Sequence, residues 1–213
     1  MVDDRGLADL HQHIRRDPAF SHLRTEGIRL VPGIGAEQPL AMVLGEAPGA
    51  TENERGEPFC GASGRVLDQL MALAGLGARE WLEGGAIRRE ANAWLTNVVK
   101  YRPPGNRTPT FKEIESAQPY LRHEWNLVGR PPLIVCVGSV AAAALGVHTP
   151  SRITRGHLYP LKDGKTYVSY QFHPAYGLRG GTDRQQQMEL QWEVMGNIME
   201  ELGWDTNRFP TVS

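Results

Sequence analysis

The sequence has no strong charge of either sign, few cysteines and no long apolar run. Its 23 lysines and arginines nearly balance 24 aspartates and glutamates, which argues against bulk non-specific packing on nucleic acid and still allows a local basic patch. No stretch approaches the roughly 20 apolar residues that span a bilayer, and the first residues lack the apolar segment of a signal peptide. Cys60 and Cys136 lack metal-ligand spacing, so we interpret both as buried free thiols rather than a disulfide. These absences predict a cytoplasmic protein.

Short apolar runs alternate with helical patterns along the 213 residues. The runs that read as strands lie at residues 39–45, 91–99, 133–138 and 165–172. The helical patterns lie at residues 4–17, 62–75, 110–128, 139–145 and 184–202. Thr110 and Glu113 are predicted to form a capping box at the start of one helix. Because alternating strands and helices favour a parallel sheet covered on both faces, we predict one α/β domain over residues 1–213.

Polar side chains stand at the ends of three predicted strands. Glu46 follows the first strand, Asn97 lies near the end of the second, and His173 directly follows the fourth. In an open parallel sheet, ligands bind in the crevice outside the carboxyl ends of the strands. One crevice would then receive a carboxylate, an amide and an imidazole. That set suits a reaction in which a flat heterocycle is held, polarised and cut from a sugar.

Two of these side chains also have an ordinary structural interpretation. Asn97 could cap the backbone at a strand end, and a single histidine is more often a packing residue than a reactive one. As functional groups, the Asn97 amide presents a donor and an acceptor that can read one edge of a pyrimidine. A neutral His173 could donate a hydrogen bond to an oxygen that becomes anionic as a base departs.

The same choice applies to an aromatic residue and to a basic loop. Phe59 is either part of the core or, with Gly61 and Gly64 close by, a ring against which something flat can lie. Residues 101–110 contain three prolines and cannot form regular structure. The basic residues in and beside this loop are either solvated surface charges or phosphate contacts.

Together these segments resemble the motifs of uracil-DNA glycosylases, and in particular the family 4, or thermophile-type, branch. The resemblance runs from about Leu40 to Arg179, in the family's order and spacing. Its motifs are residues 45–61, 96–104 and 173–176. It implies a three-layer α/β/α sandwich around a central four-stranded parallel sheet, with uracil flipped out of DNA into the crevice.

The resemblance also implies a role for each matching residue. Glu46 would orient or activate water and stabilise the cationic sugar, and His173 would stabilise charge on the leaving uracil. Phe59 would stack on the base, and Asn97 would pair with its O4/N3 edge. Glu52 stands where the family has an acidic residue near the pyrimidine C5 edge, which would help to exclude thymine. The remaining substrate-binding and DNA-binding residues would be Ala47, Lys100, Arg102, Arg107 and Arg179.

The sequence departs from family 4 in two places. Tyr101 and Ala117 stand at two of the four positions where that branch has cysteine ligands of an iron–sulfur cluster, and the N-terminal segment contains no cysteine. Because such clusters require thiolates, we predict that the cofactor is absent and that packing by Tyr101 and the N-terminal helix replaces it. Asn53 replaces the family's acidic residue, and residues 180–182 change the loop that would enter the minor groove.

The leading hypothesis is a monofunctional uracil-DNA glycosylase of base excision repair that acts as a monomer on uracil-containing DNA without any membrane. It would work in the bacterial cytosol or nucleoid, or be encoded by a phage. Because fold alone does not decide the substrate, three alternatives stay open. They are a same-fold enzyme for hypoxanthine, xanthine or hydroxymethyluracil, a phage-type DNA base-modification enzyme, and a non-enzymatic DNA-binding module.

Overall fold

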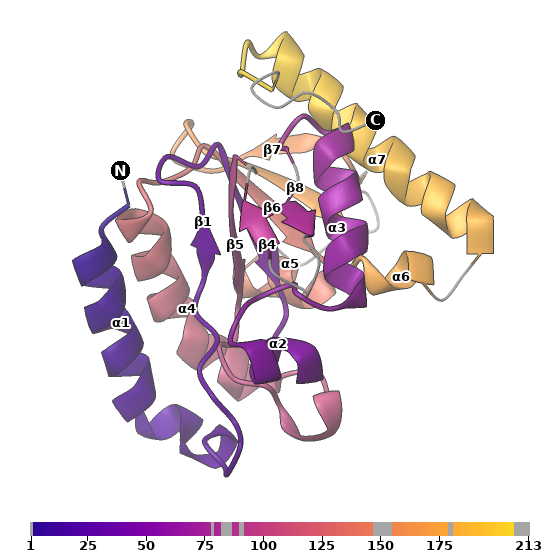
Figure 1. The fold of residues 1–213 in the computed structure, drawn as a ribbon. Helices are drawn as coiled ribbons and strands as arrows, with labels where there is room; N and C mark the ends of the chain where they lie inside the picture. The colour runs from indigo at the N-terminus through magenta and orange to yellow at the C-terminus, as the bar shows by residue number, and fades with distance from the viewer. Residues whose placement is uncertain are drawn as a thin grey trace.

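The computed structural model describes residues 2–77, 79–81, 87–89, 92–146, 155–178 and 181–206. Its centre is a six-stranded sheet with the order β1-β5-β2-β6-β8-β7 (Figure 1). The four central strands run parallel, which confirms the predicted parallel sheet. They are β5 (Ala93–Asn97), β2 (Ala41–Gly45), β6 (Leu133–Val137) and β8 (Tyr167–Gln171).

Two short antiparallel strands extend the sheet at its edges. They are β1 (Ile34–Gly35), which pairs with β5, and β7 (Leu158–Pro160), which pairs with β8. Neither was predicted, because strands of two and three residues are too short to carry an alternating pattern. A separate two-stranded antiparallel sheet consists of β3 (Arg79–Trp81) and β4 (Ile87–Arg89).

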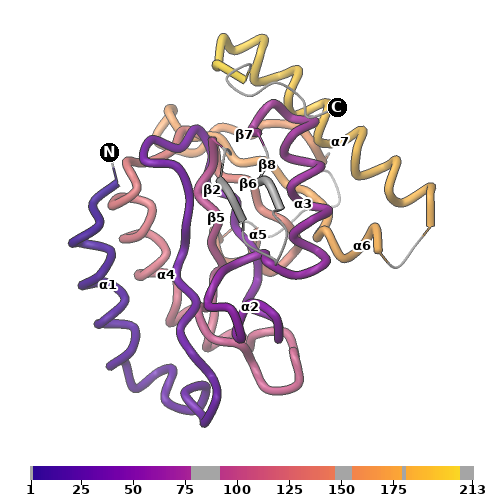
Figure 2. The backbone as a smooth tube through the Cα atoms, in the orientation of Figure 1, coloured from indigo at the N-terminus to yellow at the C-terminus, as the bar shows by residue number. Residues whose placement is uncertain are grey.

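Helices cover both faces of the sheet, as Figure 2 also shows. One face carries α1 (Asp4–Arg16), the 3₁₀ helix η1 (Pro18–Leu23), α4 (Phe111–Leu127) and α5 (Ser139–Ala144). The other face carries α3 (Ala62–Leu73) and α7 (Gly181–Glu201). The short helices α2 (Ala50–Arg55), η3 (Pro104–Asn106) and α6 (Ala175–Leu178) lie in the connections. Among the described residues, no helix has the length and apolarity needed to cross a membrane.

Alternate residues of each central strand enter the two cores. In β2, Met42 and Leu44 belong to the cluster that contains Leu10 of α1. Val43 points the other way, into the cluster that contains Trp192 of α7. Because the strands are buried on both sides, polar side chains are accommodated mainly where the strands end.

The capping box predicted at the start of α4 is present. The Thr110 amide donates to Glu113 Oε2 at 2.6 Å, and the Glu113 amide donates to Thr110 Oγ1 at 3.3 Å. These two bonds satisfy amide groups that have no partner inside the helix. The capping box therefore fixes the start of α4 directly after the proline-rich loop.

Candidate functional site

The carboxyl ends of the parallel strands place the three predicted polar residues at one edge of the sheet. Gly45 pairs in register with Asn97, so Glu46, the next residue of the chain, lies beside the end of β5. The Val99 amide donates to the Glu46 carbonyl at 3.1 Å and extends this link beyond the strands. His173 follows β8 at the same edge. A Cβ added at Gly138, which directly follows β6, would lie 3.4 Å from the His173 Cβ, so His173 packs against that turn.

An aromatic ring and an amide oxygen meet over Gly45. A Cβ added at this glycine would lie 2.5 Å from Phe59 Cζ and would also collide with Asn97 Oδ1. Phe59 is 5% exposed, and its φ of +53° lies in the left-handed region that non-glycine residues seldom adopt. Ala47 is partly buried and packs against the α1–α4 core. Glycine is therefore needed at position 45 so that Phe59 and Asn97 can approach each other at the strand end.

Glu52 has a structural task in this loop, and the base-edge role that the resemblance implies stays a prediction. Its Oε1 accepts a hydrogen bond from the Gly61 amide at 2.9 Å, and its Oε2 accepts one from the Gly49 amide at 3.1 Å. Both carboxylate oxygens are thus bonded to the backbone, and the residue is 9% exposed. Glu52 closes the loop between β2 and α3, and so holds Phe59 in place.

Lys100 is buried, so its predicted contact with a DNA phosphate is wrong. Its side chain is 3% exposed, and Nζ lies 2.6 Å from Glu124 Oε2. Nζ also donates to the Asn97 carbonyl oxygen at 2.8 Å and to the Thr96 hydroxyl. An ammonium group has three donors, and all three are used inside the protein.

Glu124 completes a buried polar network behind Asn97. Its Oε1 accepts hydrogen bonds from Trp94 Nε1 at 3.1 Å and from Thr96 Oγ1 at 2.9 Å. Its side chain is fully buried. Since a buried ion pair is stable only when its remaining polar groups are satisfied, this complete set of partners explains why Lys100 can be buried. The network anchors the backbone at the end of β5.

Glu46 is partly buried, and its carboxyl group has a raised pKa. Burial is the main cause, because it disfavours the ionised form. A hydrogen bond from the Thr108 side chain acts in the opposite direction and stabilises the carboxylate. Thr108 lies in the proline-rich loop and was not predicted to belong to the site, because nothing in the local pattern distinguishes it from a solvated residue.

The other predicted basic residues lie in that loop or outside the described residues. Arg107 donates from Nη1 and Nη2 to Glu113 at 2.8 and 2.7 Å, and it is the main cause that lowers the pKa of Glu113 to about 2. This bidentate pair anchors the loop to α4, so most of the Arg107 guanidinium is already engaged. Arg102 Nε donates to Asn106 Oδ1 at 2.6 Å. Arg179 lies outside the described residues.

The His173 ring has a defined hydrogen-bonding pattern. Its Nδ1 accepts a hydrogen bond from the Ala175 amide at 3.2 Å. An Nδ1 that accepts a bond carries no proton, so in the neutral ring the proton is on Nε2. Nε2 is therefore the donor that a neutral His173 can offer.

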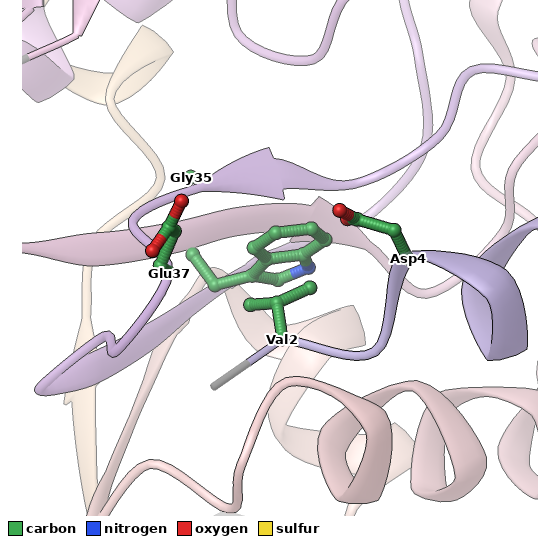
Figure 3. Close-up of a pocket in the computed structure, with 5 residues that line it drawn as sticks. Val2, Asp4, Gly35 and Glu37 are labelled. Carbon is green, nitrogen blue, oxygen red and sulfur yellow. The ribbon is translucent and has the colours of Figure 1, made fainter.

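A pocket of about 190 Å³ lies elsewhere in the molecule (Figure 3). Val2, Asp4, Gly35, Glu37 and Trp94 line it. Trp94 and Gly35 pair in register near the beginning of β5, away from its carboxyl end. None of the predicted site residues lines this pocket, so it contributes nothing to the site.

The residues present do not fit an iron–sulfur cluster. Tyr101 and Ala117 are 2% and 3% exposed and belong to the same core as α1. The Phe20 ring lies 6.3 Å from the Tyr101 ring, so hydrophobic contacts occupy this region. Cys60 and Cys136 are buried, and burial raises the pKa of both thiols, that of Cys60 to about 11. In the described part of the chain, no group of three or more histidine, cysteine or acidic side chains could hold a metal ion.

Comparison with known proteins supports the family resemblance. The family profile described as Uracil DNA glycosylase superfamily matches residues 32–195. A Type-4 uracil-DNA glycosylase from Archaeoglobus fulgidus is 39% identical over 153 residues, which cover 68% of this chain and 70% of that protein. A Type-4 enzyme from Thermotoga maritima is 32% identical over 76% of this chain and 78% of its own. A Type-5 uracil-DNA glycosylase from Thermus thermophilus is 33% identical over 64% of this chain and 65% of its own.

Proposed function

Because the chain belongs to the uracil-DNA glycosylase superfamily, we propose that it flips uracil out of DNA and hydrolyses the bond between the base and its sugar. The observation that supports this most is the site at the strand ends. There, Phe59 and Asn97 meet over Gly45, and Glu46 is the next residue of the chain. An aromatic surface and a side-chain amide suit a flat base that is recognised by one edge.

The base is held by stacking on Phe59 and is read by Asn97. The asparagine amide offers an acceptor to N3–H and a donor to O4, which matches uracil and mismatches cytosine. The clamp formed by Glu52 and the buried contact of Lys100 with the Asn97 carbonyl keep these two side chains in register. Such support from behind is what a precise binding site requires.

The bond is broken by complementary charges on either side of it. As the bond between C1′ and N1 breaks, its electron pair moves to the base and positive charge builds on the sugar. The ionised Glu46 stabilises that positive charge and takes a proton from the water that attacks C1′. His173 donates its Nε2 proton in a hydrogen bond to the uracil oxygen that becomes anionic.

The protein's assembly, location and cofactor requirement are inferred from the same family membership and sequence. We infer that it works as a monomer, as one domain and in the cytoplasm, and that it needs no resident cofactor. The absence of a thiolate set supports the last point, because two cysteines cannot ligate the cluster of the related branch. Packing of Tyr101 against Phe20 supports the same conclusion.

A panel of damaged oligonucleotides tests the proposed function. Duplexes that each contain one uracil, hypoxanthine, xanthine or hydroxymethyluracil are incubated with the protein, and alkali then cleaves the strand wherever a base has been removed. We expect cleavage of the uracil duplex to be fastest. Removal of another base in preference to uracil would point to a same-fold enzyme with another substrate, and removal of none would leave a binding or base-modification role.

Replacing Asn97 with aspartate should weaken the selectivity for uracil. The carboxylate puts an acceptor against O4 of uracil and favours a ring with an exocyclic amine, such as cytosine. We expect a penalty of about 1–3 kcal/mol for each misread contact. The measurement is the ratio of single-turnover rates on uracil and cytosine duplexes. An unchanged ratio would indicate that Asn97 only caps the strand end and does not read the base.

Replacing Thr108 with valine should move the acidic limb of the pH–rate profile to higher pH. The Thr108 hydrogen bond stabilises the Glu46 carboxylate, so its loss raises the pKa of Glu46 further above the ordinary value. Since the ionised form is the active one, the rate then falls earlier as the pH is lowered. Thr108→Ser keeps the hydroxyl group and should reproduce the wild-type profile. Superimposable profiles for wild type and Thr108→Val would exclude this role.

A further inference from the structure

Four side chains form a continuous stack beside His173. The rings of Phe172 and Tyr176 are 4.3 Å apart and inclined by only 10°. Arg155 Cζ lies 4.0 Å from the centre of the Phe172 ring, and Arg184 Cζ lies 4.6 Å from that of Tyr176. Because each ring covers one face of the other, each guanidinium must occupy an outer face. The order is therefore Arg155, Phe172, Tyr176, Arg184, which we call the arginine–aromatic stack.

The arginine–aromatic stack is built from segments that meet at the carboxyl end of β8. Phe172 precedes His173, and the Tyr176 amide donates to the His173 carbonyl at 2.8 Å. Arg155 precedes β7, and its neighbour Gly156 donates to the Tyr170 carbonyl at 3.2 Å. Arg184 lies in the first turns of α7, which Figure 1 shows next to α6. The stack thus adjoins the proposed catalytic histidine.

The two arginines differ from two of the basic residues predicted from the sequence, Lys100 and Arg107. Arg155 and Arg184 are exposed, and within the described residues neither guanidinium forms an ion pair with a carboxylate. Lys100 and Arg107, in contrast, are paired with Glu124 and Glu113. A guanidinium that packs over an aromatic ring can direct its N–H groups outward in its own plane, where they bind phosphate bidentately. The aromatic pair holds both charges in place before a ligand arrives.

We propose that the arginine–aromatic stack binds the phosphate backbone of DNA next to the flipped nucleotide. This inference rests on the proposed function, which brings a DNA strand to His173. The two pre-oriented guanidinium groups have no carboxylate partner among the residues that the structure describes. They would give a protein of net charge −1 a local basic patch beside the site. The Phe172 and Tyr176 rings act as a rigid spacer and do not read the base.

The test compares how strongly DNA binding depends on salt. Fluorescence anisotropy measures the DNA affinity of the 213-residue protein over a range of KCl concentrations. One short duplex carries 2′-fluoro-deoxyuridine, whose glycosidic bond resists cleavage because fluorine destabilises the cationic sugar, and a second is undamaged. We expect the slope of log K against log salt to fall by about 1 in Arg155→Gln or Arg184→Gln, and by about 2 in the double variant. We also expect the double variant to bind about tenfold or more weakly at low salt.

Two controls make the result specific. Arg130 also packs on an aromatic ring, at 5.6 Å from Trp125, but it precedes the amino end of β6, whereas the stack lies at the carboxyl end of the parallel strand β8. Arg130→Gln should therefore keep the wild-type slope. The double variant Arg155→Lys and Arg184→Lys keeps both charges and should keep most of the slope, with weaker binding because lysine lacks the planar fork.

The outcomes for the stack and for the proposed function are separable. An unchanged slope in the Arg155→Gln and Arg184→Gln double variant overturns the proposal, and so does an equal loss in Arg130→Gln. Wild-type protein that releases no uracil from a normal substrate would contradict the proposed function. In that case the slope on the undamaged duplex would still decide whether the stack binds DNA.

Discussion

Replacing His173 with alanine should slow single-turnover release of uracil by at least about 10², because loss of one donor from a dry, charge-stabilising site typically costs that much. The neutral ring offers Nε2 as a donor, since Nδ1 accepts the Ala175 amide. Its hydrogen bond strengthens as negative charge develops on the departing base. The effect should therefore appear in the chemical step and leave DNA affinity near the wild-type value.

Replacing Glu46 should slow the reaction as much as replacing His173, and two variants separate the effect of its charge from that of its shape. Both Glu46→Ala and Glu46→Gln remove the negative charge beneath the sugar, so both should lose at least about 10² in rate although glutamine keeps the shape. His123→Ala, an exposed histidine on α4, serves as the control and should match wild type. Rates come from rapid-quench single turnovers with saturating enzyme. A His173→Ala enzyme within about threefold of wild type would contradict its assignment as the donor.

Breaking the buried pair of Lys100 and Glu124 should destabilise the fold strongly. Lys100→Met leaves a carboxylate buried without its cation, and we expect a loss of about 3–5 kcal/mol in the free energy of unfolding. Glu124→Gln leaves the ammonium group unpaired for the same reason. In the double variant no charge remains, and the glutamine oxygen can still accept from Trp94 and Thr96. The double variant should therefore lose less than the sum of the two single losses.

Urea unfolding measures these free energies, and an exposed lysine gives the matched control. Lys112 lies on the surface of α4, so Lys112→Met should change the free energy of unfolding by no more than about 0.5 kcal/mol. Because Lys100 also holds the Asn97 carbonyl, the single variants should relax the preference for uracil over cytosine as well as the stability. If Lys100→Met is no more destabilising than Lys112→Met, the ion pair is not what holds the end of β5.

The sequence by itself determined the elements and the position of the central residues. The apolar runs at β2, β5, β6 and β8 and the capping box before α4 depend on interactions between near neighbours in the chain, which a local pattern records. Glu46, Asn97 and His173 could be assigned to one edge because parallel strands end on the same side of a sheet. The two-residue strand β1 and the three-residue strand β7 were not predicted, because so few residues cannot show an alternating hydrophobic pattern.

Only the tertiary structure decided what the charged side chains do. Lys100 looked like a surface cation until Glu124, 24 residues away, proved to be its buried partner. The sequence did not show that the Glu52 oxygens accept hydrogen bonds from the amides of Gly49 and Gly61. The arginine–aromatic stack likewise joins residues that precede β7, follow β8 and lie in α6 and α7. A charge is exposed, paired or stacked according to which distant segment the fold brings against it, and no local pattern contains that information.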